Sequence, residues 1–599
     1  MKLTDYVASF LSEHGIRHVF GLTGGAVVHL FDSISKIPQM KPIFTHHEQS
    51  AAFAAVAYAR TSGNVGVAIV TTGPGGTNAI TGVAEAWIES IPCLFISGQT
   101  RLAHTSRGKN IRQRGPQELD IISVVDSITK YAIMIDDPRM IKYHFQKAIS
   151  IARAERPGPV WIDLPLDLQW ASIEPHSLAS FSSLEEKRDL SPFNSIKEDV
   201  HKCFEFIAGA ERPVILAGFG IRLAGAEKEF IQLIKTLGIP FLATWNVSDI
   251  IQTSNELYLG RPGIFGQRGA NLAIQNCDLL ICIGSHLSIP LTGTLFNAFA
   301  REAKKIVVDV DKIELQHLNV HVDLPIACDA KEFLQEMLRQ AEINKCRDIS
   351  LWLKRCAHYK CYNAVPRHWM NQKKDVNPYV FMDLLSDVLE NDDIIVLDGG
   401  GTGAQITFQS FKVKEGQRLM IDTGLTAMGS GLPQSIGAYF GSGGRRIICL
   451  CGDGSLQLNI QELQTIVHHK LPIKIFVFNN GGYLAIRHTQ DGFLQSNYVG
   501  SDVKGGLSLP DFQKVASAYG IKCVRINSHR QLQKKIQWTL RQSGPVLCEV
   551  MIARDQQVIP RQGFDKKADG TYAPRPLEDM YPYLERKEFL ENMVIKPWG

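Results

Sequence analysis

An aspartate and an asparagine stand where two predicted neighbouring strands end, and both residue types could bind a divalent cation. Cys451-Gly452-Asp453-Gly454-Ser455 follows the apolar run 446–450, and Asn479-Asn480-Gly481-Gly482 ends the run that begins at 474. Both runs are short, apolar and bounded by Gly or Asn, which predicts two buried parallel strands joined by a helix over roughly 456–468. Parallel strands bring their carboxyl ends to one edge of the sheet, so Asp453 and Asn480 are expected to lie close together.

Carboxylate and amide oxygens are ligands that Mg²⁺ or Ca²⁺ accepts. Mg²⁺ often completes its shell with water and the phosphates of a bound molecule, so the pattern predicts a magnesium site that also holds a phosphorylated cofactor. A glycine turn with an asparagine cap is the alternative for the Gly452-Asp453-Gly454 motif alone. The matching strand end at Asn480 favours the metal.

Composition bounds the class of protein. The 599 residues suggest about three or four domains. Hydrophobic residues make up 45% and charged residues 21%, and the net charge of +4 is too small to indicate nucleic acid or an anionic membrane. No window offers about 18 uninterrupted apolar residues, and the first residues resemble an amphipathic helix. The 12 cysteines are scattered without a CxxC pair, so we expect a cytoplasmic protein with reduced thiols.

The first 172 residues are predicted to form one α/β unit. Strands end at Gly21-Leu22-Thr23-Gly24-Gly25 and before His47-Glu48-Gln49, and a strand over 65–70 leads into the Gly-rich loop Thr72-Gly73-Pro74-Gly75. Strands that alternate with helices indicate a parallel sheet. The helix over 50–60 is rich in alanine, which favours close packing, as at a subunit interface.

A polar stretch from about 172 to 195 indicates a linker, and a second α/β unit is expected over 195–340. Gly218-Phe219-Gly220 stands at a strand end there and could hold a dinucleotide phosphate at a helix N-terminus. The third glycine of that fingerprint is missing, and a structural turn is favoured. Residues 345–374 indicate a helical linker.

The third unit, 375–560, repeats the first in its order of helix, strand and Gly turn, which indicates duplication. Asp453 falls where the first copy has Pro74, whereas Glu48 of the first copy has no acidic counterpart in the third. This predicts one site shared by the first and third units, to which the third contributes Asp453 and the first contributes Glu48. Residues 561–599 are rich in Pro, Tyr and charge, and are predicted to form an arm or lid.

These motifs together resemble the thiamine-diphosphate-dependent enzymes of the acetolactate synthase and pyruvate oxidase group. The resemblance covers about residues 1–560. It is carried by 19–25, His47-Glu48-Gln49, 72–78, Arg156-Pro157-Gly158-Pro159, Met428-Gly429-Ser430-Gly431 and the Asp453 to Asn480 pair. It implies an α/β fold with three parallel-sheet domains, of which the first (pyrimidine-binding) and third (diphosphate-binding) are a duplicated cofactor-binding fold and the central one is Rossmann-like.

The resemblance also implies a site. Asp453, Asn480 and the Gly482 carbonyl would bind Mg²⁺, and Met428 would support the bent cofactor. Glu48 would be catalytic by exchanging a proton with the cofactor's aminopyrimidine ring, and Gln117 would stand near the reacting carbon. The alternatives are a helix-capping acid for Glu48 and a surface loop residue for Gln117. The cofactor-binding residues would be Thr72, Gly73, Gly400, Gly401, Thr402, Met428, Gly452, Asp453, Gly454, Ser455, Asn480, Gly482 and Tyr483.

The implied activity is decarboxylation of a 2-oxo acid, pyruvate favoured, and carboligation to an acyloin such as acetolactate, in branched-chain amino acid biosynthesis. A homodimer or homotetramer with the active site at the subunit interface is expected. The alternative is a lyase or transferase acting on another 2-oxo acid or a sugar-derived substrate without FAD. The segment 284–288 lacks the Arg that synthases carry there, and Thr489 stands where synthases have a Trp. Whether FAD is bound and which substrate is used therefore stay open. Arg487 or His488 could bind the substrate instead.

Overall fold

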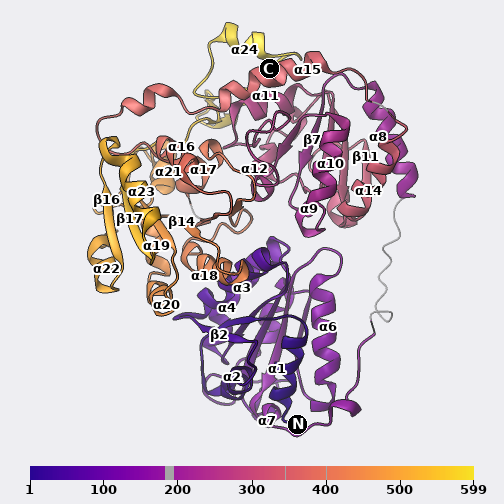
Figure 1. The fold of residues 1–599 in the computed structure, drawn as a ribbon, viewed down its shortest axis with the longest axis vertical. Helices are drawn as coiled ribbons and strands as arrows, with labels where there is room; N and C mark the ends of the chain where they lie inside the picture. The colour runs from indigo at the N-terminus through magenta and orange to yellow at the C-terminus, as the bar shows by residue number, and fades with distance from the viewer. Residues whose placement is uncertain (183–194, 345, 400, 599) are drawn as a thin grey trace.

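The chain contains three parallel sheets of six, five and six strands. The computed structural model describes residues 1–182, 195–344, 346–399 and 401–598. Figure 1 shows the first domain at the bottom, the central domain at the upper right and the third domain at the upper left. The predicted α/β class with three parallel-sheet domains is confirmed. The predicted linker over 172–195 lies partly outside the described residues.

The first sheet has the strand order β2-β1-β3-β4-β6-β5. Its central strands are fully buried and mostly apolar, as a sheet covered by helices on both faces requires. The strands are β1 (His18–Gly21), β2 (Lys41–Phe44), β3 (Gly66–Val70), β4 (Cys93–Gln99), β5 (Tyr131–Met134) and β6 (Pro159–Pro165). The helices are α1 (Leu3–Glu13), α2 (Val28–Ser35), α3 (Glu48–Ser62), α4 (Pro74–Ile88), α5 (Ile121–Val125), α6 (Ile141–Arg153) and α7 (Leu166–Gln169).

The third sheet repeats that order as β13-β12-β14-β15-β17-β16. The first and third domains therefore share one topology, as the sequence order predicts. The strands are β12 (Ile394–Leu397), β13 (Arg418–Met420), β14 (Ile447–Gly452), β15 (Lys474–Asn479), β16 (Lys522–Ile526) and β17 (Val546–Met551). The helices are α16 (Pro378–Val388), α17 (Thr402–Ser410), α18 (Gly431–Gly441), α19 (Asp453–Leu458), α20 (Glu462–His468), α21 (Leu484–Phe493), α22 (Phe512–Ala518) and α23 (Leu532–Arg541). The single helix predicted over 456–468 is two helices, α19 and α20.

The central sheet has the order β11-β10-β9-β7-β8, a doubly wound arrangement. Its strands are β7 (Pro213–Ala217), β8 (Phe241–Ala243), β9 (Leu279–Ile283), β10 (Lys304–Asp309) and β11 (Leu324–Ala327). The helices are α8 (Ile196–Gly209), α9 (Gly220–Leu223), α10 (Glu227–Leu237), α11 (Arg268–Asn276), α12 (Ile289–Thr292), α13 (Lys312–Gln316) and α14 (Ala330–Ala341), with α15 (Ser350–Lys360) in the connection to the third domain.

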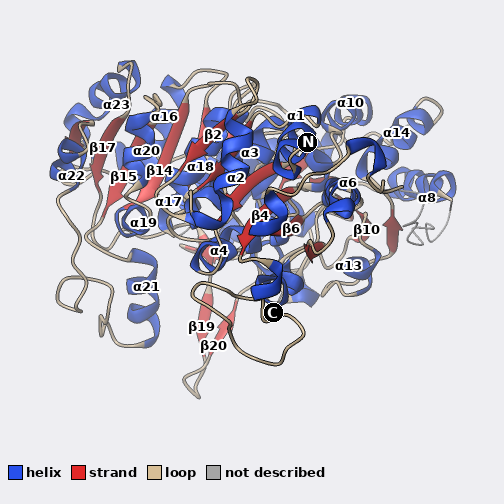
Figure 2. Ribbon diagram, turned by 90° about the horizontal axis from the view of Figure 1, so that it is seen from below, coloured by secondary structure: helices blue, strands red, loops and turns tan. Residues whose placement is uncertain are grey.

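The first and third domains meet through α3 and α18, which lie side by side in both ribbon views (Figures 1 and 2). A Cβ on Gly437 would stand 2.0 Å from the Ala54 carbonyl oxygen, so the two helix backbones touch. The small residues of the alanine-rich helix thus pack against the same chain's third domain. In this single chain they form an interface between domains.

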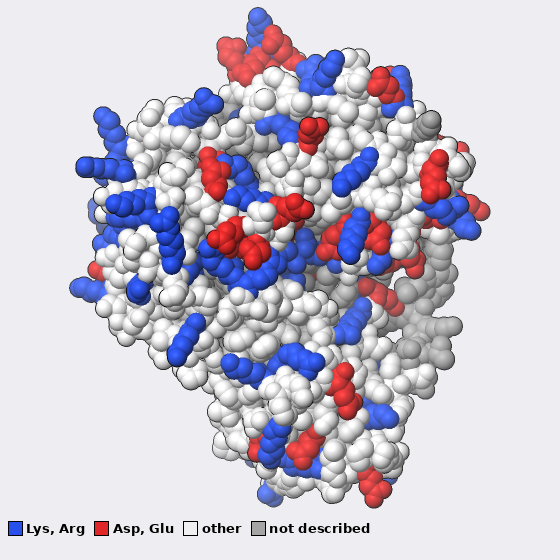
Figure 3. Space-filling model, viewed as in Figure 1, with Lys and Arg blue, Asp and Glu red and all other residues white. Residues whose placement is uncertain are grey.

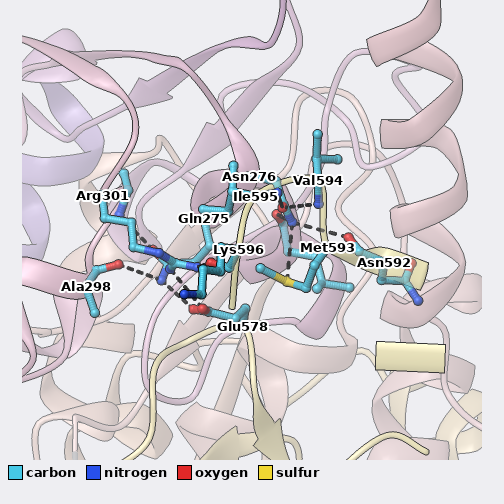
Figure 4. Close-up of polar contacts among 12 residues, drawn as sticks. Gln275, Asn276, Ala298, Arg301, Glu578, Asn592, Met593, Val594, Ile595 and Lys596 are labelled. Atoms are coloured by element: carbon cyan, nitrogen blue, oxygen red, sulfur yellow. Dashed lines mark hydrogen bonds and ion pairs between the residues drawn. The ribbon is translucent and has the colours of Figure 1, made fainter. Parts of the chain in front are cut away.

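The C-terminal segment is docked on the central domain. It contains the strand pairs β18 (Arg561–Gln562) with β21 (Met580–Tyr581) and β19 (Phe564–Lys566) with β20 (Tyr572–Pro574), followed by α24 (Arg586–Asn592). Figure 4 shows its anchors: Gln275 and Arg301 both donate to the buried Glu578 carboxylate, at 2.6 and 2.9 Å. The Asn276 side chain accepts from the backbone of Val594 at 2.7 Å. These contacts hold both ends of the segment beyond 577 against the protein body.

Charged side chains of both signs are interspersed over the face seen in Figure 3. In the part of the chain that the structure describes, no helix combines the length and the apolar character that a membrane crossing needs.

Candidate active site

Asp453 is the first residue of α19, directly after β14, and β14 lies between β12 and β15. The ends of these three strands meet at one sheet edge, so the predicted closeness of Asp453 and Asn480 is observed. The Asp453 carboxylate accepts from the backbone N–H groups of Gly454 at 2.8 Å, Asn480 at 3.0 Å and Gly481 at 2.8 Å, and from Gly482 at 3.1 Å. Burial raises the pKa of Asp453 to about 6, against the lowering effect of these donors.

Arg487 holds the Asn480 side chain. The Arg487 guanidinium donates to Asn480 Oδ1 at 2.6 Å, and also to the carbonyls of Ser501 and Arg554 at 3.0 and 2.8 Å. Only 2% of Arg487 is exposed. Both of its Nη atoms are therefore engaged with the protein itself, which speaks against Arg487 as a bidentate anchor for substrate. Within the described residues, the buried Nε2 atom of His488 has no hydrogen-bond partner, and neither has Nε of Arg487.

The donor set at this edge suits a hard cation shared with a phosphorylated ligand. It offers one carboxylate, one amide oxygen and backbone carbonyls, and among the described residues no group of three or more Asp, Glu, His or Cys side chains is arranged to hold a metal ion. A cation held by so few protein ligands needs water and phosphate oxygens to complete its shell, as Mg²⁺ does. The residues fit a Mg²⁺ ion bound together with a phosphorylated ligand. To bind the ion, Asn480 Oδ1 would give up its hydrogen bond with Arg487.

The glycines around Asp453 leave room for the Tyr483 ring on one side and open space on the other. A Cβ on Gly454 would stand 2.2 Å from the Tyr483 ring, whereas nothing lies within 4 Å of a Cβ placed on Gly452 or Gly401. Ser455 is buried in the first turn of α19. Gly400 lies outside the described residues, and Thr402 is the first residue of α17. The open space beside Gly401 and Gly452 lies at the same strand ends as Asp453.

The loop 423–431 carries Met428 past this edge, held by carboxylates. Asp422 accepts from the backbone of Leu425 at 2.9 Å and of Ala427 at 2.8 Å. Asp398 accepts from Gly429 and Gly431, both at 3.1 Å. Met428 is half-buried between these two anchor points.

Glu48 is the first residue of α3, and His47 is its N-cap. Only 7% of Glu48 is exposed, and Asn78 donates to its Oε2 atom at 3.0 Å. Within the described residues no hydrogen bond reaches Oε1. Its neighbours Gln49 and Ser50 both bond to Asn459 at 3.0 Å, so the start of α3 lies against the residue that follows α19 in the same chain. Asp453 begins α19 and Asn459 follows its last residue, and six helical residues span about 9 Å, so the start of α3 lies against the end of α19 that is away from Asp453.

Gln117 lies against the Gly-rich turn that begins α4. Its carbonyl accepts from the Thr72 hydroxyl at 3.1 Å, and a Cβ on Gly73 would stand 2.4 Å from the same oxygen. Gln117 has φ +67°, an unusual value for a residue with a side chain, and that side chain is exposed. Thr72 also contacts Gln99 Oε1 at 3.0 Å, and Gln99 donates to the buried Asp163 at 3.0 Å.

Two groups of polar residues beside the site escaped the sequence reasoning. Asp163 with Gln99 supports the Thr72 turn, and Glu89 with Asn246 supports the start of the loop 423–431. The sequence signal for these residues is an acidic or amide residue inside an apolar run or directly after one. Their partners come from distant segments, which a single sequence does not pair.

The Gly218-Phe219-Gly220 turn has a structural reason for its glycines. A Cβ on Gly218 would stand 2.1 Å from the Gly284 carbonyl, and the Gly220 N–H donates to that same oxygen at 3.0 Å. Two backbone segments therefore touch there. The structural turn favoured from the sequence accounts for the motif.

Comparison with known proteins matches all three domains. Profiles described as the N-terminal TPP binding domain, central domain and C-terminal TPP binding domain of thiamine pyrophosphate enzymes match residues 1–124, 200–337 and 399–550. The probable acetolactate synthase large subunit of Methanocaldococcus jannaschii is 33% identical over 559 residues, 92% of each chain. The chain belongs to the thiamine pyrophosphate enzyme family. The acetolactate synthase large subunits of Lactococcus lactis (32% identity, 93% of each chain) and Cyanidium caldarium (31%, 92% of this chain and 93% of that protein) are further relatives.

Membership in the thiamine pyrophosphate enzyme family confirms the predicted resemblance. The two domains that match its cofactor-binding profiles are the first and third, which contain Glu48 and Asp453 respectively. The central profile matches the domain with the five-stranded sheet. This family member is thus a thiamine-pyrophosphate-dependent enzyme related to acetolactate synthase.

Proposed function

We propose that the protein decarboxylates a 2-oxo acid, with pyruvate favoured, and joins the remaining acyl group to a second carbonyl compound to give an acyloin. With pyruvate as both substrates, two molecules give one 2-acetolactate and one CO₂. The observation that carries the proposal is Glu48, a buried carboxylate at the start of α3 with one oxygen bound by Asn78 and the other free of hydrogen bonds among the described residues. The relatives named acetolactate synthase support the reaction class.

When bound, thiamine diphosphate supplies the electron sink for loss of CO₂. Mg²⁺ would be held by Asp453, Asn480 and the Gly482 carbonyl. Diphosphate would be held by the backbone around Gly454 and by the open glycine turn that includes Gly401, as well as by Ser455, and the ring of Tyr483 covers Gly454. Met428, carried by a loop pinned at both ends, would press against the cofactor and fix its shape.

Glu48 would hold and move the proton. Asn78 fixes the carboxylate through Oε2, which leaves Oε1 to exchange a proton with the cofactor's aminopyrimidine nitrogen. Acid-base help of this kind is worth about 10² to 10⁴ in rate. Gln117, held by the Thr72 hydroxyl on the same sheet edge, would orient the reacting carbonyl.

We further propose that Glu48 acts together with Asp453 of a second copy of the chain. Large apolar side chains are exposed around the site: Ile88 by 41%, Leu458 by 49% and Ile486 by 49%. Apolar surface gathered in this way is what a second subunit would cover. A mixture of Glu48→Gln and Asp453→Ala chains tests the arrangement. A site shared between chains regains activity on mixing, because one site in each hybrid dimer is intact, whereas a site within one chain stays inactive.

The activity is tested by supplying the purified protein with pyruvate, thiamine diphosphate and Mg²⁺ and measuring CO₂ and acetolactate. Formation of both supports the proposal. CO₂ without acetolactate would keep the decarboxylation and reject the acceptor. Absence of both products would reject pyruvate.

A different substrate is the second candidate. The segment 284–288 holds no arginine, and Arg487 is engaged with protein carbonyls, so neither offers a guanidinium to the carboxylate of a second 2-oxo acid. His488, with an unpartnered Nε2 among the described residues, would instead donate to a neutral hydroxyl or carbonyl, as in a sugar-derived acceptor. Burial lowers the pKa of His488, which favours the neutral ring. Product analysis with pyruvate plus an aldose or keto-sugar distinguishes the two.

A further inference from the structure

A buried hydrogen-bond cluster joins all three domains at the start of the Met428 loop. Glu89, at the end of α4 in the first domain, accepts from the backbone of Thr423 at 2.7 Å and of Gly424 at 2.6 Å. Its other oxygen accepts from the side chain of Asn246, a central-domain residue. Asn246 also donates to the Thr423 hydroxyl at 2.8 Å. Glu89 is 6% exposed and Asn246 7% exposed.

Arg60 fixes which way the Asn246 amide faces. Its guanidinium donates to Asn246 Oδ1 at 3.1 Å and to the Ile421 carbonyl at 2.6 Å. With its oxygen turned to Arg60, the amide must present its N–H₂ group to Glu89 and Thr423. The cluster therefore has a defined donor and acceptor at each position.

The rest of the loop 423–431 is held by residues of its own domain. Asp422 and Asp398, both from the third domain, bind its later amides up to Gly431. Glu89 binds the first two, Thr423 and Gly424, from outside that domain. Loss of the Glu89 or Asn246 contacts would free the first two amides of the loop, so that Asp422 and Asp398 alone would hold the backbone on either side of Met428.

We propose that Glu89 and Asn246 are positioning residues that set the affinity for thiamine diphosphate by holding the loop 423–428 from the first and central domains. The inference rests on the proposed function, in which Met428 contacts the cofactor. Through Asn246, the central domain would contribute to the binding of thiamine diphosphate whether or not it binds a flavin.

A donor-acceptor exchange tests the cluster without changing its size. In Glu89→Gln the new amide faces the Asn246 amide, donor against donor. In Asn246→Asp two carboxylates face each other. In the double variant, the new amide at position 89 would donate to the new carboxylate at position 246 and would still accept from the loop amides through its oxygen. The new carboxylate would still accept from Arg60, so the bond between the two side chains is restored in reverse polarity.

The measurement is the dissociation constant of thiamine diphosphate with Mg²⁺, by calorimetry or fluorescence titration, which needs no substrate. Each single variant is expected to bind about tenfold more weakly, and the double variant to return close to the wild-type value. Asp249→Asn is the matched control. Asp249 is a buried carboxylate at the junction of the central and third domains that bonds to Arg222, Arg418 and the Leu419 backbone but not to the loop 423–431, so its cofactor affinity should stay unchanged.

Glu89→Gln that folds and binds the cofactor as tightly as wild type would overturn the inference. So would a double variant as weak as the weaker single one. Failure of the wild-type protein to bind thiamine diphosphate would instead reject the proposed function, so the two failures are distinguishable. Circular dichroism and melting temperature establish folding in each variant.

Discussion

Gly73→Ala is expected to disable the site while leaving the fold intact. Gly73 precedes α4 with φ +63°, and a Cβ there would stand 2.4 Å from the Gln117 carbonyl oxygen, where ordinary contact begins near 3.4 Å. The Gln117 turn must therefore move by about 1 Å, a displacement that can cost about 10²-fold in rate. The Thr72 hydroxyl, which bonds to the same carbonyl, would keep only its contact with Gln99.

The matched control is Gly63→Ala. Gly63 ends α3 in the same domain with φ +70°, and nothing lies within 4 Å of a Cβ placed there. It carries the backbone cost of a side chain at positive φ, about 1 to 2 kcal/mol, without a clash. The assay is kcat/KM for pyruvate decarboxylation together with the melting temperature of each variant. Equal kcat/KM in the two variants, within about threefold, would show that the position of the Gln117 turn does not limit catalysis.

Two further predictions concern stability. Asp249→Ala leaves Arg222 and Arg418 without their buried partner, so the free energy of unfolding should fall by about 3 to 5 kcal/mol in urea titration; a loss below about 1 kcal/mol would contradict the importance of this ion pair. Burial raises the pKa of Asp163 to about 7 from an unfolded value near 3.8, so the folded state binds the proton more readily than the unfolded state. The free energy of unfolding should therefore fall by about 4 kcal/mol as the pH rises from about 4 to 7. Asp163→Asn should remove that part of the pH dependence of unfolding, and an unchanged profile would reject the assignment.

The sequence alone predicts those parts of the fold and site that depend on local pattern. Buried strand runs followed by glycine turns place Asp453 and Asn480 at one edge, because parallel strands align their carboxyl ends. The repeat of order between the first and third units predicts the shared sheet topology. Each of these signals lies within a short stretch of chain or in the order of such stretches.

Contacts between distant segments could not be predicted in the same way. Nothing in the residues around 246 indicates that Asn246 bonds to Glu89 of another domain, since that pairing depends on how three sheets pack. Arg487 was an open candidate for substrate binding, and only the fold shows that its donors bond to protein oxygens. The alanine-rich helix was expected at a subunit interface, yet its small residues contact the third domain of the same chain, because duplicated domains pack through equivalent helices.

The proposed function depends above all on Glu48, which would exchange a proton with bound thiamine diphosphate. Deuterium exchange at the thiazolium C2 position, measured by rapid quench and proton NMR, reports that step without any substrate. The wild-type protein is expected to exchange about 10² to 10⁴ times faster than Glu48→Gln at equal cofactor occupancy. Equal exchange rates in the two proteins would contradict a role for Glu48 in this proton transfer.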